Sequence, residues 1–391
     1  MKKDFFTYQA QTTPFPLAMQ VSKAKGCYIY DQNKKPHLDF VSGVSACSLG
    51  HRHPKVVKAI KKQLDKYLHV MVYGEYIQKP AVKLCKLLSE HLPENLSKIY
   101  LTNSGTEAIE GSLKLARKVT GRSQIIAAKN AYHGNTMGSL SLMDYEERKK
   151  PFRPLIPDIS HITFNDKNEL HKITEKTAAV ILETIQGGAG FILPKKNYLK
   201  AVKKRCEEVG ALLILDEVQP GMGRTGALFS FEHYGIVPDI LVTGKGLGGG
   251  MPIGAFISSE KYMDQLSDNP MLGHITTFGG NPIIAAAAHA TLKEIIYSKL
   301  IKKSLEKEKL FRKLLSHKHI TSINGKGLML AVILKSEELA IQLVKNCANN
   351  GLILFFLLFE KKAVRISPPL TISNNEIKKG CEILIRELDK L

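Results

Sequence analysis

The sequence lacks the features by which several classes of protein are identified. Its six cysteines, at positions 27, 47, 85, 206, 347 and 381, form no Cys-x-x-Cys pair and no zinc-ligand spacing. We therefore expect reduced, scattered thiols, no metal site and a cytoplasmic location. No Walker A pattern occurs, which argues against a P-loop nucleotide site.

No hydrophobic run is long enough to cross a membrane. The most apolar one, Leu352–Phe359, falls well short of the roughly 20 residues that a bilayer requires. The first 20 residues contain Asp4, Gln9, Gln11 and two prolines, where an export signal needs an unbroken apolar core. We expect neither a membrane segment nor an export signal.

Acidic residues are scarce relative to basic ones. The chain has 56 Lys and Arg against 36 Asp and Glu, a formal charge of +20. A non-catalytic, basic nucleic-acid-binding protein is therefore one alternative. Aromatic residues make up only 7% and are not interleaved with the lysines as a stacking platform requires. In the helix predicted over 55–68 the lysines occupy the face opposite the apolar side chains, which is typical of a solvated surface.

The chain is organised around one stretch, Ala211–Ala255. An apolar run there ends at the acidic pair Asp216–Glu217, and a second run, Ile240–Thr243, ends just before Lys245 in a glycine-rich turn. Both runs are predicted strands, so a carboxylate and a lysine meet at the edge where open α/β sheets bind ligands. The flanking glycines leave the lysine amine open to approach. Schiff-base chemistry with an aldehyde cofactor needs such a lysine and an acid partner.

The same stretch also satisfies the dinucleotide-binding fingerprint, from Gly244 to Gly249. That fingerprint must open a helix. The residues that follow, Met251–Ile257, have an extended pattern instead. We therefore exclude a nicotinamide or flavin site here.

The order of elements predicts an α/β fold. At 391 residues the chain is long enough for two domains. Strands predicted at 99–101, 125–128, 179–182, 212–216 and 240–243 alternate with helices, which indicates a largely parallel sheet. An antiparallel hairpin is predicted from 27–30 and 37–41. Near the C-terminus, helices at 337–349 and from 374 accompany strand-like segments at 325–329 and 363–371.

A capped helix start follows the strand predicted at 99–101. Ser104, with Glu107 three residues later, forms a capping box. A strand, a glycine-containing turn and a helix N-terminus together make an anion site, because free N–H groups and the positive end of the helix dipole face the ligand. Such boxes are also common as purely structural caps. Because this capping box is expected to lie near Lys245, we interpret it as a binding site for a phosphate group.

Several motifs together resemble one family. The segments LDEVQPGMGRTG and TGKGLGGGMPIGAF, with markers at 49–54, 103–108 and 273–282, are similar to the class III (omega-amino-acid) aminotransferases, specifically the acetylornithine and ornithine type. The resemblance covers about residues 12–373. It implies a pyridoxal-phosphate enzyme of fold type I, with a mostly parallel seven-stranded sheet in a large domain and a smaller α+β domain. The expected parts are 1–44 and 298–391 for the small domain and 45–297 for the large one.

The resemblance also implies roles for residues. Lys245 would hold pyridoxal 5′-phosphate and move the proton between substrate and cofactor, while Asp216 would keep the ring nitrogen protonated. An obligate homodimer is implied, in which Thr277 reaches the cofactor phosphate of the neighbouring subunit. The remaining cofactor-binding residues implied are Ser104, Gly105, Thr106, Tyr132, His133, Glu183, Val218 and Gln219.

The substrate-binding residues implied are Arg365, Tyr73, Asn135 and Gly188. Arg365 would grip a carboxylate of 2-oxoglutarate in a ping-pong transfer. Many relatives have glutamate at the position of Gly188, which masks that arginine, and arginine at the position of Asn135, which contacts the donor. Because of these two departures, the donor is not fixed by the resemblance. We favour an ornithine or N-acylornithine-like donor. The alternatives are other class III activities, namely a 4-aminobutyrate or diamine transaminase, an aminomutase or a racemase.

Overall fold

The computed structural model describes all residues, 1–391. A seven-stranded sheet forms its centre, in the order β4-β10-β9-β8-β7-β5-β6. Only β10 runs antiparallel to its neighbours, β4 and β9. The strands are β4 (Lys98–Thr102), β5 (Gln124–Ala128), β6 (Ile159–Ile162), β7 (Thr177–Glu183), β8 (Leu212–Asp216), β9 (Ile240–Gly244) and β10 (Gly254–Ser258).

The central strands are buried on both faces because helices cover the sheet. Every residue of β7, β8, β9 and β10 is buried, as expected for continuous apolar strands in a parallel sheet. The longer helices are α3 (Pro54–Leu64), α4 (Lys79–Ser89), α5 (Gly105–Thr120), α8 (Tyr198–Val209) and α10 (Pro282–Tyr297). Short helices are α2 (Ser42–Ser45), α6 (Met137–Ser141), α7 (Glu146–Lys149) and α9 (Glu260–Met263).

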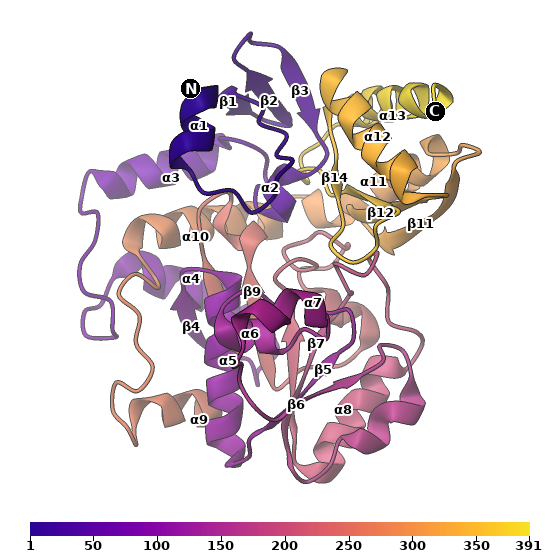
Figure 1. Ribbon diagram of the computed structural model, residues 1–391. Coiled ribbons are helices and arrows are strands. Elements are labelled where there is room, and N and C mark those ends of the chain that lie inside the picture. The colour runs from indigo at the N-terminus through magenta and orange to yellow at the C-terminus, as the bar shows by residue number, and fades with distance from the viewer.

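The two ends of the chain come together at one side of the molecule, where Figure 1 shows the indigo and yellow segments. One sheet has the order β1-β2-β3-β13 and the other β11-β12-β15-β14. Their strands are β1 (Val21–Lys25), β2 (Tyr28–Asp31), β3 (Pro36–Asp39), β11 (Ile320–Lys326), β12 (Met329–Leu334), β13 (Leu352–Ile353), β14 (Phe355–Phe356) and β15 (Ala363–Ile366). The helices are α1 (Lys2–Tyr8), α11 (Leu300–Leu314), α12 (Glu337–Asn349) and α13 (Asn374–Asp389). The division at residues 44 and 297 stays a prediction.

The expected α/β architecture and the N-terminal hairpin are confirmed. The hairpin is β2 and β3, which pair antiparallel. The strand-like segment at 325–329 contains the end of β11 and the first residue of β12, and only Gly327 and Leu328 form the turn between them. Gly327 has φ +61°, and a Cβ there would lie 2.3 Å from the Arg224 carbonyl oxygen. None of the helices is both long and apolar enough to span a bilayer.

Candidate active site

Three charged side chains meet at the carboxyl edge of the large sheet. Glu183 and Asp216 end the adjacent strands β7 and β8 and are register partners. Lys245 directly follows β9, the next strand. The structure thus brings Asp216 and Lys245 to one edge, as the two apolar runs predict.

Lys245 is a half-buried amine without a hydrogen-bond partner. Burial lowers its pKa from the ordinary value; Asp216 raises it, Arg365 lowers it and Glu183 raises it. A lowered pKa increases the fraction of neutral, nucleophilic amine. The lysine also has a left-handed backbone (φ +37°), a conformation that costs free energy in a non-glycine residue.

Close packing requires glycine at two of the positions after Lys245. Lys245 begins a 3-10 turn, η4 (Lys245–Gly248), before β10. A Cβ at Gly246 would lie 2.3 Å from Ser48 Oγ, and one at Gly249 would lie 2.2 Å from Thr291 Oγ1. After this single 3-10 turn the chain enters β10, so the dinucleotide fingerprint opens no α-helix.

Asp216 is buried and held through both carboxylate oxygens. Its Oδ2 lies 2.8 Å from Nδ1 of His133, and its Oδ1 accepts a hydrogen bond from the Val218 N–H at 2.9 Å. Nε2 of His133 is buried without a partner. The histidine therefore fixes the orientation of the carboxylate.

Glu217 does not share the site with Asp216, although the sequence delivers the two together. Adjacent residues of a strand point to opposite faces. The Glu217 carboxylate is fully buried on the other side, where it accepts the N–H groups of Ser230 (2.9 Å) and Phe231 (2.8 Å) at the start of the 3-10 helix η3 (Ser230–Tyr234). Burial raises its pKa to about 8. Its role is structural.

Glu183 connects two loops of the site. Its carboxylate accepts the N–H of Tyr132 at 3.0 Å and the N–H of Gly187 at 2.8 Å. Burial raises its pKa to about 7. A Cβ at Gly187 would lie 2.7 Å from Oε1 of Gln219, whose Nε2 is buried without a partner. Tyr132 and Gln219 are thereby held at the same edge as Asp216.

The N-terminus of α5 forms a second wall. Ser104 is its N-cap, and its Oγ accepts the Glu107 N–H at 3.3 Å. The predicted capping box is only half formed, since Glu107 accepts the N–H of Asn103 (2.7 Å) and not that of Ser104. The first-turn N–H groups of a helix have no intrahelical acceptor, so those of Gly105 and Thr106 can bind an anion.

Close packing joins this helix start to the rest of the site. A Cβ on Gly105 would lie 2.9 Å from Val218 Cγ1, so the valine rests directly on the helix N-terminus. The Thr106 hydroxyl lies 2.8 Å from that of Thr136 and 2.7 Å from that of Ser139. The loop that carries His133 is thereby tied to α5.

Arg365 is a buried guanidinium with spare donors. It lies on β15, is 7% exposed, and its Nε and Nη1 have no hydrogen-bond partner. Burial lowers its pKa to about 10, and its Cζ lies 5.9 Å from the ring centre of Phe191. A buried cation without a partner costs folding free energy unless an anion binds to it.

Gly188 is covered by an aromatic ring. Its carbonyl oxygen accepts the N–H of Phe359 at 2.9 Å, and a Cβ at this position would lie 2.7 Å from Cδ2 of that ring. Phe359 thus fills the space that a larger residue at 188 would need. Asn135, the other departure from the family pattern, is exposed.

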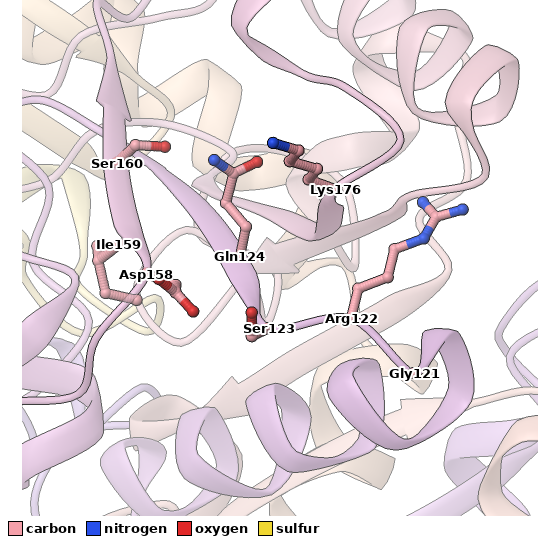
Figure 2. A pocket seen from close by; sticks show the side chains of 8 residues that line it. All are labelled: Gly121, Arg122, Ser123, Gln124, Asp158, Ile159, Ser160 and Lys176. Atoms are coloured by element: carbon pink, nitrogen blue, oxygen red, sulfur yellow. The ribbon is translucent and has the colours of Figure 1, made fainter.

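A surface hollow of about 420 Å³ lies at the opposite edge of the sheet, beside the first residues of β5 and β6. Figure 2 shows the residues that line it: Gly121, Arg122, Ser123, Gln124, Asp158, Ile159, Ser160 and Lys176. The Arg122 guanidinium is already bound to the carbonyl oxygens of Thr177 and Val209. The hollow is therefore separate from the site at Lys245.

Comparison with known proteins identifies the family. The family described as aminotransferase class-III matches residues 7–388. The chain belongs to the class III aminotransferases. An acetylornithine aminotransferase of Clostridium acetobutylicum is 40% identical over 92% of this chain and 94% of its own length. A putrescine aminotransferase of Pectobacterium atrosepticum is 40% identical over 89% of this chain and 77% of its own length.

Solved structures agree with this assignment. The ornithine aminotransferase from Toxoplasma gondii ME49 has a TM-score of 0.92 and 29% identity, covering 100% of this chain and 95% of that one. This class III aminotransferase thus has fold type I, and its cofactor is pyridoxal 5′-phosphate. The residues at the sheet edge fit that group. They offer a free lysine, a buried carboxylate, a helix N-terminus and the unpartnered nitrogens of His133 and Gln219.

Tyr73 and Thr277 lie together at the surface of the molecule. Their hydroxyl oxygens are 3.4 Å apart, both residues are exposed, and neither has a hydrogen bond to the residues around Lys245. Large apolar side chains are exposed in the same two segments: Leu68, Val70, Met71, Tyr76, Ile77, Met271, Leu272, Ile275 and Phe278.

Two residues near the site escape prediction from the sequence. Phe359 lies on Gly188, and the guanidinium of Arg148 lies 5.9 Å from the Phe359 ring centre. Neither residue belongs to a motif. Their positions follow only from the packing of the C-terminal segment against the loop at 187–190.

Proposed function

We propose that this class III aminotransferase moves an amino group from an ornithine or N-acylornithine-like donor to 2-oxoglutarate, in a ping-pong reaction through the pyridoxal and pyridoxamine forms of the cofactor. The main support for this proposal is Arg365. Its guanidinium is buried, two of its nitrogens have no hydrogen-bond partner, and its charge acts on Lys245. A carboxylate of 2-oxoglutarate would complete it with bidentate, charge-assisted hydrogen bonds.

The relatives favour this type of donor. Acetylornithine aminotransferases of Methanopyrus kandleri and Clostridium acetobutylicum are 37% and 40% identical to this chain. The putrescine aminotransferase at 40% keeps a diamine donor as the competing hypothesis.

When bound, pyridoxal phosphate supplies the carbonyl group that takes up the amine and a ring that accepts electrons. In this proposal Lys245 would be the attachment point and then the proton carrier, because a lowered pKa makes its amine easier to deprotonate. Asp216, oriented by His133, would hold the proton on the ring nitrogen. Tyr132 and Val218 would bound the two faces of the ring, with Gln219 near its oxygen.

The phosphate would lie at the start of α5. The N–H groups of Gly105 and Thr106 and the hydroxyl of Ser104 would bind it, supported by the helix dipole. Glu183 would act as a positioning residue through the N–H groups of Tyr132 and Gly187.

We also propose a homodimer in which Thr277 of each subunit completes the partner's phosphate site, with Tyr73 beside it at the substrate. The exposed apolar side chains around both residues support this, since large exposed apolar patches usually mark interfaces. Sedimentation velocity should give a dimer at micromolar concentration, and a monomer would contradict the proposed homodimer.

We also propose a cytoplasmic location, because all six cysteines are free.

An amine-donor panel with 2-oxoglutarate, scored by glutamate formed, tests the function. Ornithine, N-acetylornithine, 4-aminobutyrate and putrescine are the informative donors. Glutamate from N-acetylornithine or ornithine is expected. If no donor yields glutamate, the aminotransferase proposal is wrong for these substrates and an aminomutase or racemase assay should follow.

A further inference from the structure

Arg148 is a free cation on the short helix α7. Its side chain is exposed and forms no hydrogen bond or ion pair. The neighbouring Arg153 differs, because Glu146 binds its guanidinium through both oxygens at 2.9 and 2.8 Å. Arg148 is therefore available to an anion, whereas Arg153 is already neutralised.

An aromatic contact holds Arg148 in place. Its Cζ lies 5.9 Å from the ring centre of Phe359, within the range of a cation–π interaction. The ring of Tyr145, at the N-cap of α7, lies 5.6 Å from that of Phe359. Phe359 in turn is bound to the Gly188 carbonyl oxygen at 2.9 Å. The guanidinium is thus attached to the loop that borders the site.

Contacts also join Arg148 to the residues around Lys245, because Phe359 is bound to Gly188 and the adjacent Gly187 N–H is bound by Glu183. Burial raises the pKa of Tyr132, and the charge of Arg148 is the first influence that opposes the rise. Tyr132 is held by Glu183, whose charge acts on Lys245. These links place Arg148 on the exposed side of the same site in which Arg365 is buried.

The two arginines make the site selective for charge. Arg365 offers a cation inside, and Arg148 offers a second one toward solvent, with no acidic side chain bound to either. A donor whose far end carries a carboxylate is attracted by the outer cation. A diamine, whose far end is an ammonium group, is repelled by it.

We propose that Arg148 binds the carboxylate at the end of the amino donor remote from the reacting amine, and so selects an anionic donor over a diamine. This inference rests on the proposed function and deepens it. It assigns donor recognition to a residue on α7, in a chain whose position 135 is an uncharged, exposed asparagine.

Calorimetric titration of the cofactor-loaded protein with N-acetyl-L-norvaline tests the assignment. This probe has the acyl group and carboxylate of N-acetylornithine but no amine to react. Arg148→Gln should weaken its binding about tenfold, the loss typical of a charge-assisted hydrogen bond. Arg153→Gln is the matched control and should bind like the wild type. The uncharged amide of the probe should bind wild type and Arg148→Gln equally.

Donor kinetics supply the second readout. Arg148→Gln should raise KM for N-acetylornithine and lower KM for putrescine, with little change in kcat for either. Unchanged binding of the carboxylate probe by Arg148→Gln would overturn the proposal, because Arg365 alone would then account for it. Failure of every donor to yield glutamate would instead overturn the proposed function, while the titration would still report on Arg148.

Discussion

Nδ1 of His133 lies 2.8 Å from Oδ2 of Asp216, and both side chains are buried at the carboxyl edge of the large sheet. The second oxygen of Asp216 is bound by the Val218 N–H. With both oxygens held, the carboxylate has one orientation. Such fixed geometry is what a group that must keep a proton on a bound ring requires.

Asp216→Asn should retain pyridoxal phosphate and lose at least a hundredfold in kcat. The amide oxygen can accept the Val218 N–H while the amide NH2 donates to Nδ1 of His133, so the geometry survives, but a neutral amide does not stabilise a positive ring nitrogen. Cofactor absorbance and turnover measure the two effects separately. Glu217→Gln is the control, since Glu217 faces the core, and it should keep its kcat. Near-normal turnover in Asp216→Asn would contradict the role of Asp216.

Borohydride treatment of the loaded protein should attach the cofactor permanently to Lys245. This lysine has no hydrogen-bond partner and a lowered pKa. Peptide mapping by mass spectrometry identifies the modified residue, and Lys245→Ala should remain unlabelled. Label on another lysine would show that the attachment point lies elsewhere.

Arg365→Ala should weaken the use of 2-oxoglutarate at least tenfold, because loss of a buried charge partner costs about 2–5 kcal/mol. Arg365→Lys should recover part of the loss, since it restores the charge without the bidentate geometry. KM for 2-oxoglutarate and its binding by calorimetry are the measurements. An unchanged KM in Arg365→Ala would place the acceptor carboxylate elsewhere.

Gly188→Ala should destabilise the protein by about 1–3 kcal/mol, the usual cost of overpacking. The new Cβ would lie 2.7 Å from the Phe359 ring. Gly188→Glu, which introduces the gate glutamate of relatives, should meet the same obstacle before it can pair with Arg365. Urea unfolding of Gly188→Ala, Phe359→Ala and the double variant gives a double-mutant cycle. The two substitutions should be strongly coupled in the free energy of unfolding. Additive effects would mean that the ring moves aside freely.

The contribution of Glu217 to the stability of the protein should fall as pH rises from about 4.5 to about 8. Burial raises the pKa of Glu217 from 4.5 to about 8, so the folded state binds more protons than the unfolded state in this window. The midpoint of urea unfolding, measured at several pH values between about 4.5 and about 8, should decline more steeply with pH in the wild type than in Glu217→Gln. Equal slopes would show that Glu217 does not titrate as its burial implies.

The sequence by itself determined the elements and the centre of the site. Apolar runs ending at Asp216 and just before Lys245 specify strands that deliver both residues to one edge, because parallel strands share a direction. Ser104 specifies the start of α5 through a local hydrogen bond. These features depend on neighbouring residues, and local patterns are therefore enough to predict them.

Only the tertiary structure decided the surroundings of that centre. It separated Glu217 from Asp216, left the capping box half formed, and placed Phe359 on Gly188. The position of Arg148 beside Phe359 likewise joins segments far apart in the chain. Such contacts depend on how side chains fill space between distant segments, and neither periodicity nor a motif encodes that packing.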